Sequence, residues 1–298
     1  MTTRRETAPA KLNLYLHVLG RRADGFHLLD SLVAFADIGD EIVVAPADAL
    51  SLAVTGPFAA ALPDQRDGNL VWRAAMLLSE RIGRPAGAAI TLVKNLPVAS
   101  GIGGGSSDAA ATLRALAALW QADLDDDAFG EIAVALGADV KICLGREAAW
   151  LGGIGEHIEP APNLPPVALV LANPGVALPT ADVFKRRSRP FSALARFTET
   201  PRDAAHLAAL LAARGNDLTA AARDLVPAIG DVLATLAATD GALLARMSGS
   251  GATCFALYAT RNEAEAAAQA LTAAHPAWWV KAGALLQNSL SPPGRGLG

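Results

Sequence analysis

The segment from Pro97 to Ser107 carries the most chemical information in the chain. Gly101 and the run 103–105 place four glycines within five positions. Because glycine has no Cβ, such a backbone approaches a ligand closely and turns its N–H groups toward an anion. Ser106 and Ser107 open a predicted helix, whose N-terminal amides and dipole favour a phosphate. We therefore predict a phosphate-binding loop made of Pro97, Val98, Ala99, Ser100, Gly101, Ile102, Gly103, Gly104, Gly105, Ser106 and Ser107.

Two common nucleotide-binding loops do not explain this segment. A Walker A loop has a lysine directly before its serine or threonine, and no lysine precedes the serine pair here. In the dinucleotide fingerprint a third glycine stands where this chain has Ser106. The alternative is a flexible connection with a capping serine, but three consecutive glycines between a strand and an uninterrupted helix favour the phosphate loop.

Strands and helices alternate irregularly around the loop. Residues 11–18 have polar and apolar side chains at period two, which predicts a half-buried strand. Further strands are predicted at 28–35, 40–44, 51–54, 89–94, 167–172, 241–247 and 253–258, and helices at 69–82, 107–120, 126–136, 203–213, 225–238 and 261–274. This mixture predicts the α+β class. The proline-rich stretch 159–166 is the best boundary, giving domains 1–158 and 159–298. The last ten residues are predicted to form a loose tail.

The composition excludes several classes of protein. Of 298 residues, 52% are hydrophobic and 18% charged, which excludes disorder. A net charge of −4 gives no general attraction for nucleic acid or anionic lipid. Alanine-rich stretches explain the mean hydropathy of +0.31, and no spanning segment or signal peptide is visible. Cys143 and Cys254 are too few for a disulfide framework. We expect a cytoplasmic protein with no nucleic-acid or membrane partner.

Several motifs occur together in one order along the chain. They are the segment 97–107, Pro9-Ala-Lys-Leu-Asn-Leu-Tyr-Leu, Arg22-Ala-Asp-Gly-Phe-His, Leu136-Gly-Ala-Asp-Val, Asn173-Pro-Gly-Val and Met247-Ser-Gly-Ser-Gly-Ala. This set resembles the GHMP kinases. The resemblance implies a two-domain α+β fold, with ATP and an alcohol substrate bound in the cleft between the domains.

The resemblance also implies the chemical roles of two residues. It places a general base at Asp139 and a lysine beside it at Lys11. Phosphoryl transfer needs a base, a cation and a phosphate cradle, and a nearby lysine favours an ionised carboxylate. Asp139 follows Gly137, where a loop is expected to hold its carboxylate in the cleft. Read alone, Asp139 also fits a turn or helix cap, and Lys11 a solvated edge lysine.

The N-terminal motifs resemble most the GHMP kinases that phosphorylate the 2-hydroxyl of a cytidine diphosphate-linked methylerythritol in the non-mevalonate isoprenoid pathway. The implied substrate-binding residues are Asn13, Phe26, His27, Thr180 and Phe184. An aromatic ring is expected to stack on the cytosine while His27 hydrogen-bonds its edge. Phe26 stands where the family usually has tyrosine, so stacking is kept but the phenol hydroxyl is lost.

Mg²⁺ is expected to accompany ATP, although the sequence shows no carboxylate pair or metal-ligand spacing for it. ATP phosphates, water and a loop serine are expected to hold it. We expect a monomer or weak homodimer. The alternatives are a GHMP-type kinase for another small alcohol, such as homoserine or mevalonate, and a non-catalytic nucleotide-binding relative.

Overall fold

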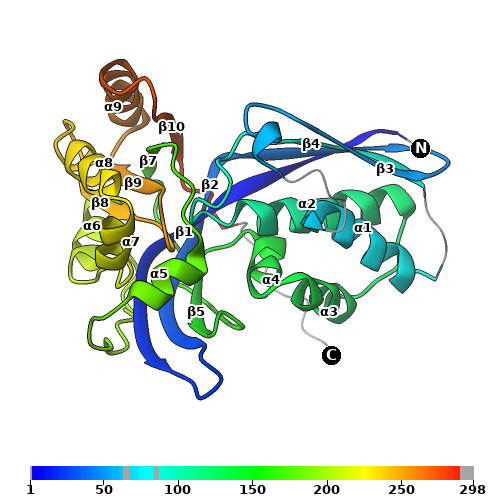
Figure 1. Ribbon diagram of the computed structural model, residues 1–298, viewed down its shortest axis with the longest axis horizontal. Helices are drawn as coiled ribbons and strands as arrows, with labels where there is room; N and C mark the ends of the chain where they lie inside the picture. Colours follow the sequence, from blue (N-terminus) through cyan, green and yellow to red (C-terminus); the bar gives the residue numbers. More distant parts are fainter. Residues whose placement is uncertain (1, 63–67, 84–86, 289–298) are drawn as a thin grey trace.

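The structure is a computed structural model that describes residues 2–62, 68–83 and 87–288. The tail predicted at 289–298 lies outside these residues. Figure 1 shows two groups of elements side by side, with a long pair of strands running from one to the other. These strands are β1 (Arg4–Arg21) and β2 (His27–Pro46), which pair antiparallel along their full lengths.

The first sheet is built around β2. It has the order β3-β4-β2-β5-β6, with β1 also paired to β2. Its other strands are β3 (Leu50–Thr55), β4 (Ala88–Val93), β5 (Ala149–Gly153) and β6 (His157–Pro160). The two strands predicted at 28–35 and 40–44 are thus one continuous strand. A short 3-10 helix at Ala59–Ala61 follows β3.

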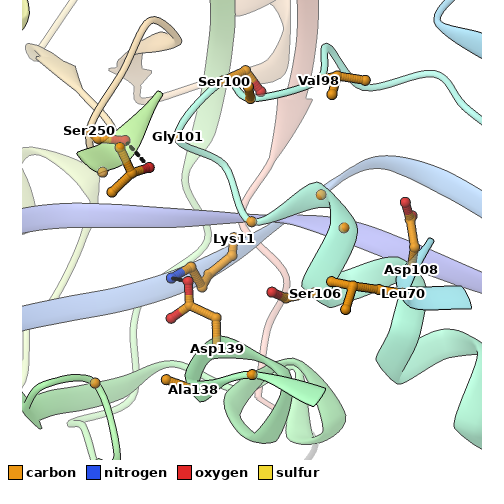
Figure 2. A pocket seen from close by; sticks show the side chains of 18 of the residues that line it. Lys11, Leu70, Val98, Ser100, Gly101, Ser106, Asp108, Ala138, Asp139 and Ser250 are labelled. Atoms are coloured by element: carbon orange, nitrogen blue, oxygen red, sulfur yellow. Dashed lines mark hydrogen bonds and ion pairs between the residues drawn. The ribbon is translucent and has the colours of Figure 1, made fainter. Parts of the chain in front are cut away.

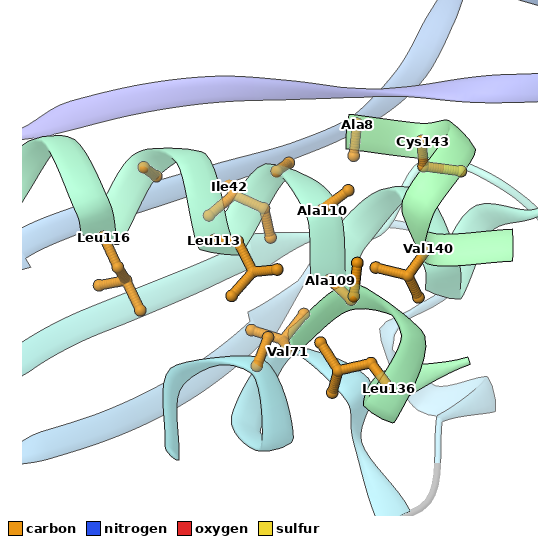
Figure 3. Close-up of a cluster of buried hydrophobic side chains, with 14 of the residues drawn as sticks. Ala8, Ile42, Val71, Ala109, Ala110, Leu113, Leu116, Leu136, Val140 and Cys143 are labelled. Atoms are coloured by element: carbon orange, nitrogen blue, oxygen red, sulfur yellow. The ribbon is translucent and has the colours of Figure 1, made fainter. Parts of the chain in front are cut away.

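Four helices pack beside this sheet. They are α1 (Leu70–Arg81), α2 (Gly104–Trp120), α3 (Asp126–Leu136) and α4 (Ala138–Gly145). Figure 3 shows the core that they share, where Leu113 of α2 lies among Ile42, Val71 and Val140. Alanines along α2 let the neighbouring elements approach closely. Burying one leucine or isoleucine here contributes about 1.5–3 kcal/mol, so this packing fixes α2 and α4 against each other.

The second sheet is antiparallel and has the order β10-β7-β9-β8. Its strands are β7 (Ala168–Asn173), β8 (Leu244–Met247), β9 (Cys254–Tyr258) and β10 (Trp279–Ala284). The accompanying helices are α5 (Thr180–Arg186), α6 (Ala204–Ala212), α7 (Thr219–Leu225), α8 (Ala228–Ala237) and α9 (Arg261–Ala274). Mixed sheets and helices confirm the predicted α+β class.

The strand predicted at 11–18 is real, but the prediction that it is half-buried is wrong. Both of its faces are buried, because β1 and β2 pack on the second sheet as well as on the helices of the first. Leu12 and Leu32 share a core cluster with Leu169 and Leu257. A register shift between Asn13 and Tyr15 also interrupts the strict alternation.

Several short elements differ from the expectation. The sequence reading did not include β5, β6, β10, α4, α5 and α7. Helix α8 begins at Ala228, three residues later than predicted, because α7 ends at Leu225 and Pro227 occupies the N-cap of α8. Among the described helices, none combines the length and apolar character needed to cross a membrane.

Candidate active site

A cavity of about 630 Å³ lies where the two groups of elements meet. Its wall includes Lys11 of β1, Asp139 of α4, Thr180 of α5 and Ser250 from the turn between β8 and β9. It also includes most of the segment 97–107, which is called the glycine loop below. Figure 2 shows Lys11, Gly101, Asp139 and Ser250 converging from separate elements around one open space. The fold therefore gathers chemically active side chains that are more than 200 positions apart in the chain.

The glycine loop lines one side of this cavity through its backbone. Gly101 and Gly103 have φ angles of +76° and +62°, which L side chains rarely adopt. A Cβ added to Gly101 would lie 2.5 Å from the carbonyl oxygen of Ser248. Helix α2 begins at Gly104, three residues before the predicted start at Ser107. The first amide N–H groups of a helix have no carbonyl partner within it. In α2 the first of these groups belong to Gly104 and Gly105.

The residues of the predicted phosphate loop do not all face the cavity. Those that line it are Pro97, Val98, Ala99, Ser100, Gly101, Gly103, Gly104, Gly105 and Ser106. Ile102 is buried, and its carbonyl accepts a hydrogen bond from the backbone N–H of Lys11 at 2.9 Å. The Ser107 hydroxyl donates to the carbonyl of Pro9 at 2.6 Å. Ile102 and Ser107 therefore join the loop to β1.

Lys11 and Asp139 form an ion pair at the cavity wall. Lys11 Nζ lies 2.7 Å from Asp139 Oδ2, with the lysine side chain 6% and the aspartate side chain 39% exposed. Asp139 stands in the first turn of α4 and not in a loop, since Gly137 ends α3 and directly precedes α4. The N-terminal end of a helix favours a carboxylate. The pair thus combines a buried cation with a carboxylate that remains accessible from the cavity.

Asn13 lies beside this pair on β1 and also lines the cavity. Its amide nitrogen donates to the Ser31 hydroxyl at 2.8 Å. Its backbone N–H donates to the Ser248 hydroxyl at 3.2 Å, and that hydroxyl donates to the carbonyl of Gly101 at 3.0 Å. These bonds connect β1, the glycine loop and the turn after β8 in one network.

Helix α5 contributes Thr180 and Phe184 to the cavity wall. The Thr180 and Ser250 hydroxyls are hydrogen-bonded at 2.8 Å, and Phe184 lies one turn further along the helix. The Phe184 ring stacks on His27, with 4.9 Å between centroids and 25° between planes. Phe26 is 58% exposed, and neither Phe26 nor His27 is among the residues that line the cavity. The aromatic partner of Phe184 in this structure is therefore His27.

Burial keeps His27 in its neutral form over a wider pH range than usual. Desolvation, followed by the positive charges of Arg21 and Arg187, lowers its pKa below the ordinary value. A neutral imidazole offers one donor and one acceptor nitrogen. His27 can therefore exchange hydrogen bonds with the edge of an uncharged base.

The sequence reading missed a buried charge cluster beneath the glycine loop. Lys94 Nζ lies 2.5 Å from Asp40 Oδ2 and 2.7 Å from Asp108 Oδ2, and all three residues are almost fully buried. Asp40 also accepts from the backbone N–H groups of Asn95 and Leu96, which precede the loop. Asp40 and Asp108 are 54 and 14 positions from Lys94 in the sequence, so no local sequence pattern predicts the cluster. The cluster anchors both ends of the glycine loop.

Asp108 is the unusual member of this cluster. Its Oδ1 is buried and has no hydrogen-bond partner in the described part of the chain, and the residue lines the cavity. Burial raises the pKa of Asp108 to about 8 against the lowering effect of Lys94, and the negative charge of Asp40 adds to the rise. Two aspartate side chains thus share one lysine beside the glycine loop. The described residues hold no group of three or more histidine, cysteine or acidic side chains that fits a metal ion.

Comparisons with known proteins agree with this geometry. Residues 69–146 match the GHMP kinases N terminal domain and residues 191–277 match the GHMP kinases C terminal domain. A 4-diphosphocytidyl-2-C-methyl-D-erythritol kinase of Paramagnetospirillum magneticum is 55% identical over 96% of this chain and 100% of its own length. One of Parvibaculum lavamentivorans is 54% identical over 94% and 97%, respectively.

Solved structures show the same relationship. A crystal structure of a 4-(cytidine 5'-diphospho)-2C-methyl-D-erythritol kinase is 37% identical, with a TM-score of 0.78 over 95% of this chain and 99% of that one. A homoserine kinase from Cytophaga hutchinsonii shares the fold at 18% identity, with a TM-score of 0.73 over 97% and 96%. The chain belongs to the GHMP kinases, in the family of the 4-diphosphocytidyl-2-C-methyl-D-erythritol kinases.

Proposed function

We propose that this chain uses Asp139 and Lys11 to phosphorylate the 2-hydroxyl of 4-diphosphocytidyl-2-C-methyl-D-erythritol with ATP, in the non-mevalonate route to isoprenoid precursors. The kinase activity follows from near full-length relatives at 54–55% identity. The observation that supports the two catalytic roles is the 2.7 Å contact between Lys11 Nζ and Asp139 Oδ2 on the wall of the shared cavity.

In the proposed mechanism Asp139 accepts the proton of the substrate hydroxyl. Lys11 Nζ contacts Oδ2, which leaves Oδ1 for that proton. The hydroxyl oxygen then forms a bond to the γ-phosphorus of ATP while the bond from that phosphorus to the β–γ bridging oxygen breaks. ADP carries away the bridging oxygen. Most of the rate gain comes from positioning and charge stabilisation, which the rigid cavity wall supplies.

The glycine loop is the proposed ATP phosphate site. At Gly101 and Gly103 the backbone adopts positive φ angles and lies so close to its neighbours that a Cβ would be strained. The proposed phosphate site therefore depends on glycine at both positions. The first amides of α2 add unpaired donors and the positive end of a helix dipole. Both features fit an anion with several oxygens.

Mg²⁺ fits this site as an ion that arrives with ATP. The donor set consists of the Ser106 hydroxyl and Asp108, both on the cavity wall; the buried Oδ1 of Asp108 has no hydrogen-bond partner among the described residues. Mg²⁺ commonly binds through one or two carboxylates together with substrate phosphates and water. When bound, it would neutralise charge on the phosphate oxygens.

The part of the cavity beside Phe184 of α5 is the proposed site for the cytidine part of the substrate. Phe184 provides an aromatic face, and neutral His27 provides hydrogen bonds. Asn13 and Thr180 would bind the substrate between this part and the ion pair. His27 reaches the cavity through its stacking on Phe184, whereas Phe26 is 58% exposed and stands outside the cavity wall.

The substrate proposal is tested by measuring ADP release with Mg-ATP and four alcohols. These are 4-diphosphocytidyl-2-C-methyl-D-erythritol, the same alcohol without cytidine, homoserine and mevalonate. We expect turnover with the cytidylated compound alone. Turnover with homoserine or mevalonate at a similar kcat/KM would overturn the substrate assignment, and the absence of turnover with every alcohol would overturn the kinase proposal.

A further inference from the structure

Arg114 connects three elements of the candidate site without lying in it. It stands in the middle of α2, ten residues after Gly104, and its side chain is 19% exposed. Its guanidinium contacts the last turn of α4 and the early part of β1. Those elements carry Asp139 and Lys11, while α2 itself begins with the glycine loop. We infer that Arg114 is a positioning residue that sets Asp139 against Lys11.

The hydrogen bonds of Arg114 use every part of its guanidinium. Nη1 donates to the carbonyl oxygens of Cys143 at 3.0 Å and Leu144 at 3.2 Å. Nη2 donates to the carbonyl of Thr7 at 3.3 Å, and Nε donates to Glu6 Oε2 at 3.2 Å. Carbonyls in the last turn of a helix lack intrahelical partners, so Arg114 satisfies two groups that α4 cannot satisfy itself.

Arg114 adds directional contacts to the packing of α4. The helix has eight residues, follows Gly137 directly, and ends at Gly145, with Arg146 as its C-cap in the left-handed region at a φ of 55°. Its buried Val140, Ile142 and Cys143 attach it to the core, but apolar contacts are non-directional. The planar fork of an arginine fixes direction as well as distance. A cation at the C-terminal end of α4 is also favourable to the helix dipole.

The contacts of Arg114 lie close to the ion pair along both α4 and β1. Cys143 is four residues from Asp139 along α4, which corresponds to about 6 Å along the helix axis. Thr7 is four residues from Lys11 on β1, in a strand fixed by pairing with β2. Shifting the end of α4 away from β1 therefore changes the contact between Asp139 and Lys11. A misplacement of about 1 Å at a reacting group costs up to about 100-fold in rate.

Arg146 provides a matched control. It also pairs with Glu6, at 3.5 Å, but no hydrogen bond from its side chain to a carbonyl of α4 is present in the described residues. Removing Arg146 therefore removes a cation from the same carboxylate and leaves the fork of Arg114 in place. A purely electrostatic role of this cluster would make the two arginines similar, whereas a positioning role would not.

The test compares Arg114→Met, Arg114→Lys and Arg146→Met in steady-state assays with Mg-ATP and the cytidylated substrate. We expect Arg114→Met to lower kcat about 10- to 100-fold, with both KM values within about twofold of the wild type. Arg114→Lys should fall between, because lysine keeps the charge and loses the fork. Arg146→Met should stay within about twofold of the wild type. Wild-type kcat in folded Arg114→Met, or a rise in KM with unchanged kcat, would overturn the inference.

Removing a largely buried arginine can prevent folding, so circular dichroism accompanies each assay. If Arg114→Met is unfolded, folded Arg114→Lys decides, and a kcat within about twofold of the wild type would then limit Arg114 to a structural role. The inference rests on the proposed roles of Lys11 and Asp139, and Asp139→Asn is therefore assayed in parallel. An active Asp139→Asn would reject those roles. An inactive Asp139→Asn together with an unimpaired Arg114→Met would reject the Arg114 inference alone.

Discussion

The Ser248 hydroxyl donates a hydrogen bond to the carbonyl of Gly101 at 3.0 Å and so joins the turn between β8 and β9 to the glycine loop. The same hydroxyl accepts from the backbone N–H of Asn13 on β1. One buried side chain therefore links the second sheet to both the glycine loop and β1. Geometry across the cleft depends on this contact.

Ser248→Ala should loosen the phosphate loop. The change leaves the buried N–H of Asn13 without its acceptor, which costs about 1–3 kcal/mol. We expect a lower Tm and a several-fold higher KM for ATP. Thermal unfolding and steady-state kinetics measure both effects. Thr272→Ala removes an exposed hydroxyl on α9 and serves as the control. Equal effects of the two substitutions on KM for ATP would contradict the linking role of Ser248.

Gly101→Ala should damage the cradle more severely. The new Cβ would lie 2.5 Å from the Ser248 carbonyl oxygen, at a φ of +76°. The loop must then move, and we expect loss of ATP binding by calorimetry together with a lower Tm. Gly215→Ala meets no atom within 4 Å and gives the matched control. Unchanged ATP affinity in Gly101→Ala would show that the loop does not cradle the nucleotide.

Asp108 should make the stability of the protein depend on pH. Its folded-state pKa of about 8 lies above the ordinary aspartate value, so the folded state binds a proton that the unfolded state releases. This contribution is fully present below about pH 4, declines as the pH rises, and is lost above about pH 8. Asp108→Asn cannot ionise, so its Tm relative to the wild type should increase over that interval.

Thermal unfolding at about pH 5 and about pH 9 measures this difference. Asp224→Asn, at an exposed carboxylate that pairs with Arg186, is the control and should show no such trend. A Tm difference between Asp108→Asn and the wild type that is the same at both pH values would mean that Asp108 is ionised throughout.

Phe184→Ala should weaken binding of the cytidylated substrate and leave ATP binding unchanged. The substitution removes the ring on which His27 stacks, and an aromatic pair contributes about 0.5–1.5 kcal/mol beyond its buried area. We expect KM for the cytidylated substrate to rise about tenfold or more, since area burial is lost as well. Phe191→Ala, at a ring 53% exposed outside the cavity wall, is the control. An equal rise in KM for ATP would argue against a separate cytidine site.

Much of the fold follows from local patterns in the sequence. Helix α3 was predicted at its observed bounds, and its N-cap Asp125 accepts from the N–H of Ala128. The end of this helix at Gly137 agrees with the structure, but the loop expected after it is a helix, because a glycine that ends one helix can also directly precede the next. Nothing local indicates that α4 starts there. Asp139 was therefore expected in a loop and stands in a helix.

The candidate site was only partly visible in the sequence. Glycine spacing revealed the phosphate loop, but the buried Lys94 cluster and the bonds of Arg114 join residues from distant elements. Contacts of this kind arise from tertiary packing and leave no periodic trace. The proposed roles of the site residues and the division into 1–158 and 159–298 stay predictions. The boundary between residues 158 and 159 falls within β6 (His157–Pro160) of the first sheet, and β7 of the second sheet begins at Ala168.

The central claim is that Asp139 takes the proton from the substrate hydroxyl while Lys11 holds its carboxylate. The most direct test is kcat for Asp139→Asn with saturating Mg-ATP and 4-diphosphocytidyl-2-C-methyl-D-erythritol, together with the Kd of each substrate. The account predicts a loss of about 100- to 10,000-fold in kcat, with both Kd values nearly unchanged, because the amide keeps the shape and cannot accept the proton. Near-normal turnover by Asp139→Asn would contradict it.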